Sequence, residues 1–273
     1  MESVSVVTGG LAGGPASLAS LTAWWLPCGL FICLGLASFM AAAPEPAGAA
    51  RRRNARAVLL LSAACAALMF AWMLRDMLCL VRQDCAPWLG WEGMDEPILT
   101  LLFAALAQRH TDIWIPVTGL GSTPWLVAVG VLASSGALWR RDWWRLLAWA
   151  LAGPGIALWI WALKLWVRRP RPELALIGEQ GWSFPSGHSA GSLVVYGLLA
   201  WTAAGSLRAR GRGLAALLAW CAALALVALV GISRVVLSVH HASDVMAAWL
   251  LGIAWLGLLL ALLDWLRERR GLQ

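Results

Sequence analysis

Residues 143–166 read WWRLLAWALAGPGIALWIWALKLW, a run that stays almost wholly apolar until it reaches Lys164 near its end. A run of about 20 apolar residues is long enough to cross the hydrocarbon core of a bilayer as a helix. Only a helix satisfies its backbone polar groups within a single segment surrounded by lipid. This stretch therefore predicts a membrane-spanning helix with a cation close to one end.

The rest of the chain has the same character. It is 61% hydrophobic and 13% charged over 273 residues, whereas soluble domains carry about 25% charged residues. We therefore expect an all-α fold, a polytopic membrane bundle of about seven transmembrane helices. The expected spans are residues 21–43, 57–81, 123–139, 143–166, 188–206, 214–234 and 244–266.

Arginines gather in four short segments, and these segments predict the orientation of the bundle. If all seven spans cross the membrane, the four segments lie on one side, which the positive-inside rule assigns to the cytoplasm. The N-terminus and the connections after residues 166 and 234 then face the exterior or the periplasm. Topology therefore explains the net charge of +7 without a nucleic-acid partner. The arginines are Arg51, Arg52, Arg53 and Arg56; Arg140, Arg141 and Arg145; Arg208, Arg210 and Arg212; and Arg267, Arg269 and Arg270.

Three segments outside the main spans carry further expectations. Residues 1–20 contain no basic residue, so they lack the n-region of a signal peptide, and their Gly- and Ser-rich composition indicates a flexible lead-in. We expect residues 1–50 to hold this lead-in and an additional transmembrane helix, and residues 51–273 to hold the main domain. The apolar segment Ile98–Ala107 predicts a helix that lies against the membrane or packs on the bundle.

The six cysteines form no CxxC pair and no zinc-ligand spacing, so the sequence predicts no metal site. Most lie inside apolar runs, as small core residues do. Cys79 and Cys85 can pair if they face an oxidising compartment. The sequence leaves that pairing open.

Three cations stand close to segments rich in other polar chemistry. Lys164 is the only lysine in the chain; Arg171-Pro172 follows seven residues later, and Arg234 follows Ser233. Any one of them alone is consistent with a side chain that reaches to the headgroup region. Together they suit phosphate, because an arginine presents a planar fork to its oxygens and a lysine a point charge.

Pro185-Ser186-Gly187-His188 precedes an apolar run and has the form of a helix start. The free N–H groups of a first helical turn favour an anion. Gly187 allows close approach of a ligand to the backbone, and Ser186 offers a hydroxyl. His188 would then stand beside a bound phosphate and give it a proton.

His240 and Asp244 are four residues apart, a spacing that places both on one face of a helix. A carboxylate that accepts from one ring nitrogen leaves the other nitrogen free to attack. His241, three residues before Asp244, is the competing candidate.

The three motifs Lys-x6-Arg-Pro, Pro-Ser-Gly-His and Ser-Arg-x5-His-x3-Asp, in this order, resemble the type 2 phosphatidic acid phosphatase (PAP2) family. The resemblance covers roughly residues 95–266, and Thr118-Gly-Leu-Gly-Ser122 is similar to a weaker family feature. It implies a six-helix core, a nucleophile at His240 that forms a phosphohistidine, Asp244 as the residue that orients it, and His188 as acid and then base. It also implies no cofactor or metal, and phosphoryl contacts from Lys164, Arg171, Ser186, Gly187 and Arg234.

The predicted function is hydrolysis of a lipid phosphate or diphosphate at the outer face of the cytoplasmic membrane. Undecaprenyl diphosphate is the leading substrate; phosphatidic acid, phosphatidylglycerol phosphate and lipid A phosphate are alternatives. Arg168 and Arg169 add charge beside the site, and one hypothesis has either of them contact a second phosphate.

Two rival functions remain at this stage, and the oligomeric state stays open. One is vanadate-dependent haloperoxidase chemistry, which the apolar spans disfavour because relatives of that kind are soluble. The other is a non-catalytic lipid-phosphate binder or transporter, which the complete set of His188, His240 and Asp244 disfavours.

Overall fold

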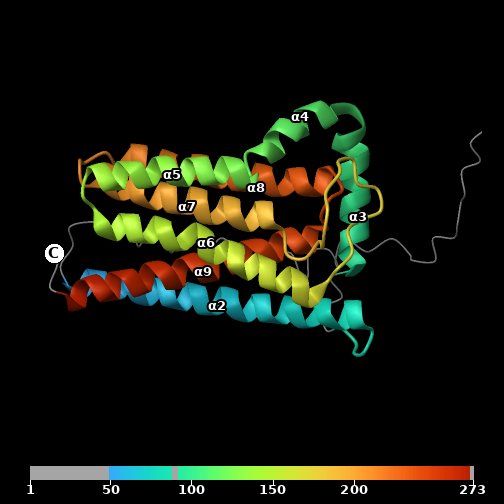
Figure 1. Cartoon of the computed structure of the whole chain (residues 1–273), viewed down its shortest axis with the longest axis horizontal. Helices are drawn as coiled ribbons and strands as arrows, with labels where there is room; N and C mark the ends of the chain where they lie inside the picture. Colours follow the sequence, from blue (N-terminus) through green and yellow to red (C-terminus); the bar gives the residue numbers. More distant parts are fainter. Residues whose placement is uncertain (1–48, 88–91, 271–273) are drawn as a thin grey trace, which may run out of the picture.

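The computed structural model describes residues 49–87 and 92–270, and all regular structure in these ranges is helical. Six long helices run side by side (Figure 1). They are α2 (Ala49–Arg82), α5 (Thr123–Trp139), α6 (Trp143–Val167), α7 (Gly187–Arg208), α8 (Gly213–Val236) and α9 (Ala242–Arg269).

Five of these helices agree with the expected spans to within three residues at each end, whereas α2 begins eight residues before the expected span at 57–81. The all-α membrane bundle is confirmed. By length and composition, α2, α6, α7, α8 and α9 can each cross a membrane. A sixth crossing is possible if α5 and the segment Thr111–Gly119, bent by 40° at the break between them, count as one span. The expected span at residues 21–43 lies outside the described residues, and the proposed division at residue 50 stays a prediction.

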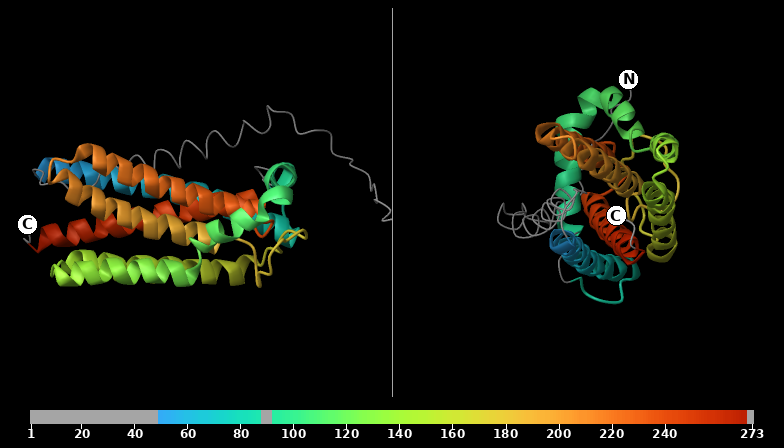
Figure 2. Two further views of the ribbon diagram at one scale, coloured as in Figure 1. Left: turned by 90° about the horizontal axis from the view of Figure 1, so that it is seen from above. Right: turned by 90° about the vertical axis from the view of Figure 1, so that its left-hand side faces the viewer.

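Helix α9 forms the centre of the bundle. In its most apolar stretch 72% of the residues are buried, against 28% in α2 and 33% in α6 and α8. It packs on α2, α6 and α7, and the end-on view in Figure 2 shows it enclosed by them. A side chain at Gly252 would meet Leu193 Cδ2 at 2.9 Å, so a residue without Cβ lets α9 approach α7. Because α9 is held on several sides, the residues at its start are held as well.

A helical connection crosses one end of the bundle. It consists of α3 (Glu92–Leu102), a π-helix (Phe103–Ala107) and α4 (Gln108–Gly119). In Figure 1, α3 stands across the ends of the long helices. Leu99 is buried against Val235, Ala242 and Val245, so the apolar segment predicted at Ile98–Ala107 packs on the bundle.

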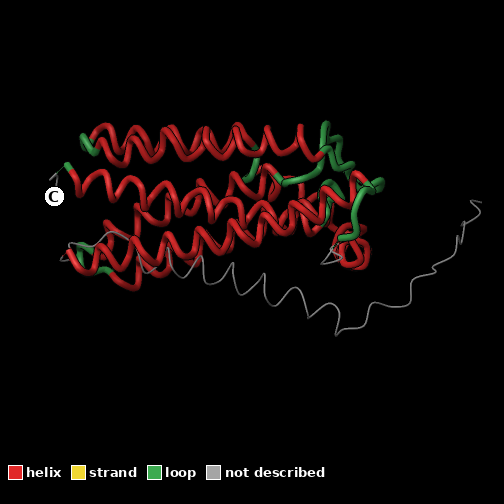
Figure 3. The backbone as a smooth tube through the Cα atoms, turned by 90° about the horizontal axis from the view of Figure 1, so that it is seen from below, coloured by secondary structure: helices red, strands yellow, loops and turns green. Residues whose placement is uncertain are grey.

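The two ends of the bundle differ in their connections. The start of α2, the short turns after α5 and α7, and the end of α9 lie at one end, and these carry the four arginine-rich segments (Figures 1 and 3). The long connections between α6 and α7 and between α8 and α9 lie at the other end. The structure therefore separates arginine-rich turns from motif-bearing loops, as the topology argument predicts.

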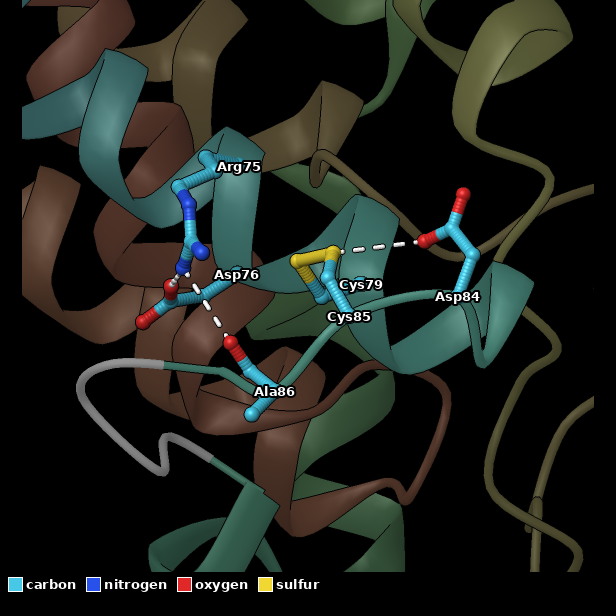
Figure 4. Close-up of a disulfide and its surroundings, with 6 residues drawn as sticks. All are labelled: Arg75, Asp76, Cys79, Asp84, Cys85 and Ala86. Carbon is cyan, nitrogen blue, oxygen red and sulfur yellow. Dashed lines mark hydrogen bonds and ion pairs between the residues drawn. A yellow bond between two sulfur atoms is a disulfide. The ribbon is translucent and has the colours of Figure 1, made fainter.

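A disulfide closes the end of α2 on the side of the motif-bearing loops (Figure 4). Cys79 and Cys85 are joined, with 4.9 Å between their Cα atoms. Arg75 Nη1 donates to Asp76 Oδ1 at 3.0 Å and to the carbonyl of Ala86 at 3.3 Å, which ties down the chain after the disulfide. The pairing that the sequence left open is present.

Candidate active site

The end of α6 sets the direction of the first motif. Arg168 adopts a left-handed conformation with φ 55°, and its N–H donates to the carbonyl of Lys164 at 3.1 Å, which closes the helix. The loop that follows folds back over the helix end. Lys164 Nζ donates to the carbonyls of Trp182 and Ser183 in that loop.

Arg171 joins this loop to the turn before α9. Its guanidinium donates to the carbonyl of Val239 at 2.7 Å and to the carbonyl of Gly181 at 3.0 Å. The Nη1 atom also lies 3.3 Å from His240 Nε2. Two motifs separated by about seventy residues of sequence therefore meet at one point.

The contacts of His240 define its protonation state. Burial lowers the pKa of the His240 ring to about 3, although Asp244 favours the charged form, so the imidazole is neutral near pH 7. An arginine can only donate, so Nε2 next to Arg171 holds the lone pair and the proton is on Nδ1. Nδ1 faces Asp244 Oδ2 at 3.5 Å and Ser183 Oγ at 3.3 Å. This is the tautomer in which Nε2 can attack.

The pairing of His240 with Asp244 does not use a helix face, which corrects the sequence argument. Helix α9 begins at Ala242, and His241 is its N-cap, so His240 precedes the helix. The turn before α9 brings His240 to the carboxylate instead. Asp244 Oδ2 also accepts the N–H of His241 at 3.0 Å and lies 3.4 Å from its Nδ1, so distance to Asp244 does not distinguish the two rings.

An open cavity of about 360 Å³ distinguishes them, because His240 lines it and His241 does not. Gly187 has only Ile160 within 4 Å of the position a Cβ would take, at 3.6 Å, so its backbone is open to a ligand. The cavity thus gathers predicted residues from all three motifs beside other residues of α6 and the loop. Its lining is Trp161, Lys164, Leu165, Arg171, Glu179, Gln180, Gly181, Trp182, Gly187, His188 and His240.

Arg234 reaches the cavity through Glu179. Its Nη1 donates to Thr118 Oγ1 at 2.7 Å, and its Nη2 donates to Glu179 Oε1 at 2.5 Å. Glu179 also lies 3.7 Å from Arg171. Burial alone would raise the pKa of Glu179, but its bond to Arg234 and the neighbouring positive charges lower it, so the carboxylate is ionised. The carboxylate of Glu179 therefore pairs with Arg234 and Arg171, two of the cations that are predicted to bind phosphate.

Three predicted residues do not line the cavity: the fully buried Arg234, which bonds to Glu179, and Asp244 and Ser186. Asp244 is fully buried on the far side of His240, consistent with an orienting role. Ser186 is also fully buried, and its hydroxyl pairs with that of Ser189 at 2.9 Å. The structure does not bring Ser186 to the cavity, and its phosphate contact stays a prediction.

The hypothesis that Arg169 contacts a second phosphate is wrong. Arg169 is 4% exposed and faces away from the cavity. It donates to Asp244 Oδ1 at 2.6 Å, to Ser243 Oγ at 2.7 Å and to Asp95 Oδ2 at 2.7 Å. The left-handed turn at Arg168 separates the two arginines, since Arg168 stays exposed with its Nε on the carbonyl of Leu165 at 2.9 Å. For Arg168 the hypothesis stays a prediction.

Sequence reasoning missed several residues of the site. Asp95 and Ser183 belong to none of the motifs and carry no local signal. Glu179 had a weak signal as a carboxylate in the connection between two motifs that hold cations. The segment Thr118–Ser122, which resembles a weaker family feature, did identify residues next to the site. Thr118 accepts a hydrogen bond from Arg234, and a Cβ at Gly121 would lie 3.2 Å from Cβ of His188.

One cluster could be mistaken for a metal site. Among the described residues, Cys79, Asp84 and Cys85 are the group of potential ligands close enough to share an ion. Its two sulfurs are already joined in the disulfide. The cluster therefore does not present three free ligands.

Comparisons with known proteins identify the family. The family model of the PAP2 superfamily matches residues 142–268. Phosphatidylglycerophosphatase B of Bacillus subtilis (strain 168) is 32% identical over 165 residues, which cover 59% of this chain and 79% of that protein. The crystal structure of a transmembrane PAP2-type phosphatidylglycerolphosphate phosphatase from Bacillus subtilis matches with a TM-score of 0.62 and 26% identity, covering 76% of this chain and 96% of that one. With its three motifs assembled around a single cavity, the chain belongs to the PAP2 superfamily.

Proposed function

We propose that this protein removes phosphate from a membrane lipid through a phosphohistidine intermediate on His240. The position of His240 Nε2 carries the proposal: this atom holds a lone pair in the cavity, 3.3 Å from the guanidinium of Arg171. A nucleophile beside a fixed cation suits attack at phosphorus, because the cation stabilises charge that shifts onto the phosphoryl oxygens.

In the first half-reaction, Nε2 of His240 attacks phosphorus, the P–N bond forms and the bond to the leaving oxygen breaks. His188, protonated beside the phosphoryl group, gives its proton to that oxygen and becomes neutral. The ring keeps its proton on Nδ1 and becomes cationic, and Asp244 stabilises that charge. Phosphoryl contacts are assigned to Lys164, Arg171, Ser186, Gly187 and Arg234.

In the second half-reaction, His188 takes a proton from water, and the water oxygen attacks phosphorus as the P–N bond breaks. His240 returns to its neutral form and inorganic phosphate leaves. Metal and cofactor have no place in either step. The carboxylate of Glu179 must yield its contacts with Arg234 and Arg171 to the phosphoryl group at the start of each cycle.

The lipid chain is expected to stay in the bilayer. Trp161 and Leu165 line the cavity and are 61% and 46% exposed on α6, a helix long enough to span the membrane. They support an approach of the substrate from the lipid side of α6. The outer-face location is favoured by the arginine-rich turns at the opposite end, and by the disulfide at the end that carries the motifs.

Phosphatidylglycerol phosphate is now the first candidate substrate, because the names of both relatives refer to it. Undecaprenyl diphosphate was favoured from the sequence, partly because Arg168 or Arg169 could contact its second phosphate. Arg169 is buried, so it does not provide that contact. Phosphatidic acid and lipid A phosphate remain in the same chemical class, as lipids with a terminal phosphate.

Phosphate release from a panel of these four lipids by the purified protein in detergent tests the proposal. We expect release from phosphatidylglycerol phosphate, persistence in EDTA, loss in His240→Ala and at least partial retention in His241→Ala. Lipid binding without any phosphate release would instead support a non-catalytic binder or transporter. Wild-type rates in His240→Ala would reject His240 as the nucleophile.

A further inference from the structure

A buried ionic cluster lies directly behind the catalytic pair. We propose that Arg169 is a positioning residue that fixes Asp244 against His240, and that Asp95 balances the charge of Arg169 so that Asp244 can support a cationic ring. The inference rests on the proposed phosphohistidine mechanism and adds two residues to it.

The two oxygens of the Asp244 carboxylate have different partners, because Arg169 binds only one of them. Oδ1 accepts from Arg169 Nη1 at 2.6 Å. Oδ2 is left for the active site, where it accepts from the hydroxyl of Ser183 and the N–H of His241 and faces His240 Nδ1. A carboxylate held at one oxygen cannot rotate freely, so the second oxygen keeps its direction toward the imidazole.

Asp95 holds the same cluster from α3. Its Oδ2 accepts from Arg169 Nη2 at 2.7 Å and from Ser243 Oγ at 2.6 Å, and its Oδ1 accepts the N–H of Ser243 at 2.9 Å. Ser243 lies in the first turn of α9, where a carboxylate also complements the helix dipole. Asp95 therefore fixes both the guanidinium and the residue that directly precedes Asp244.

The charges of the cluster suit the reaction. Asp95, Asp244 and Arg169 are all nearly inaccessible to water, with side chains 5% exposed or less. Their charges sum to minus one, so a single positive charge on His240 makes the buried group neutral. That charge appears when the P–N bond forms with Nδ1 still protonated. Without Asp95, the cluster would carry a net positive charge at this stage, and phosphorylation would be disfavoured.

The alternative role for Arg169, direct phosphate binding, predicts different kinetics. A residue that acts through Asp244 changes the rate of phosphorylation but not the affinity for inorganic phosphate, which binds the cavity cations. A residue that touches phosphate weakens that affinity. The inhibition constant of inorganic phosphate therefore separates the two roles.

The test uses Arg169→Met, Arg169→Lys and Asp95→Asn in the full-length protein, assayed with phosphatidylglycerol phosphate. We expect kcat to fall about 100-fold in Arg169→Met and about 10-fold in Asp95→Asn, the range found in metal sites when a residue that orients a metal-binding side chain is removed. Arg169→Lys should recover only part of the loss, because one ammonium cannot bridge two carboxylates as a planar fork does. The inhibition constant of inorganic phosphate should stay within about twofold of the wild type.

Arg56→Met is the matched control, since it removes an arginine that pairs with Glu268 at 2.6 Å near the far ends of α2 and α9. It should leave kcat unchanged. Asp95→Asn keeps the shape of the cluster and carries the test if Arg169→Met does not fold. An unchanged kcat in folded Asp95→Asn, or a rise in the phosphate inhibition constant of an Arg169 variant, would overturn the inference. An inactive wild type would instead refute the proposed function.

Discussion

Replacing His240 with glutamine should change how the stability of the protein responds to pH. In the folded protein the ring has a pKa of about 3 and stays neutral from pH 7 to pH 5. In the unfolded chain a histidine has a pKa of about 6.5 and gains a proton over this range. The unfolded state then binds more protons, so the wild type loses stability as the pH falls.

The size of this loss follows from the two pKa values. Protonation of an unfolded histidine with a pKa of about 6.5 lowers the free energy of unfolding by about 2 kcal/mol between pH 7 and pH 5. In a protein of this size that corresponds to about 4–8 °C in Tm. His240→Gln lacks the titrating ring. The Tm of this variant minus the Tm of the wild type should therefore be higher at pH 5 than at pH 7 by about this amount.

Thermal unfolding followed by tryptophan fluorescence measures the effect, with both proteins in one detergent and one buffer series. The comparison cancels the titration of every group whose surroundings the substitution leaves unchanged. If the difference in Tm between wild type and variant is the same at pH 7 and pH 5, the ring is not held neutral by its surroundings. The account of Nε2 as a ready nucleophile would then fail.

Three further predictions concern the surroundings of the site. Gly121→Ala should lower kcat about 100-fold, as about 1 Å of displacement can, because its Cβ would clash with Val230 Cγ1 and lie 3.2 Å from His188 Cβ, so that Val230 and with it His188 must shift. Gly119→Ala, with nothing within 4 Å, should match the wild type in the same assay. Glu179→Gln should lower the inhibition constant of inorganic phosphate about fivefold, since a neutral amide competes less well for arginine than a carboxylate; an unchanged or higher constant would contradict this. Cys79→Ser should lower Tm by about 4–8 °C with turnover retained, and peptide mapping that finds free thiols in the wild type would argue against the disulfide.

The helices of the described residues could be predicted from the sequence because the bilayer imposes simple rules. An apolar run of sufficient length has one stable form in lipid, so the expected span 143–166 and the observed helix Trp143–Val167 differ by one residue. The family, the all-α class and the assignment as a phosphatase acting on lipid phosphates are also confirmed. These could be predicted because the charged and polar residues of the motifs are easily recognised in a chain that is otherwise mostly apolar.

The contacts among loops could not be predicted in the same way. Asp95 and Arg169 are 74 residues apart, and no periodicity links a residue of α3 to one after α6. The same limit explains the error about Arg169: both Arg168 and Arg169 read as added charge, and only the left-handed turn between α6 and the loop sends one outward and the other into the protein. His240 does line the cavity, but its role as nucleophile stays a prediction, and the helix-face argument for it was wrong.

The position of the cavity constrains how the enzyme can select among lipids. Hydrolysis of a lipid phosphate requires water, so the cavity must open at the aqueous end of the bundle. The lipid chain must remain in hydrocarbon, where Trp161 and Leu165 on α6 offer apolar contact to any chain. Discrimination therefore falls to groups close to the phosphate, and Gln180 and Trp182 are two cavity residues there with side chains that have no assigned catalytic or phosphate-binding role. Because they lie in the loop that Arg171 and Lys164 hold by its carbonyls, substrate choice and phosphate binding depend on the same few contacts.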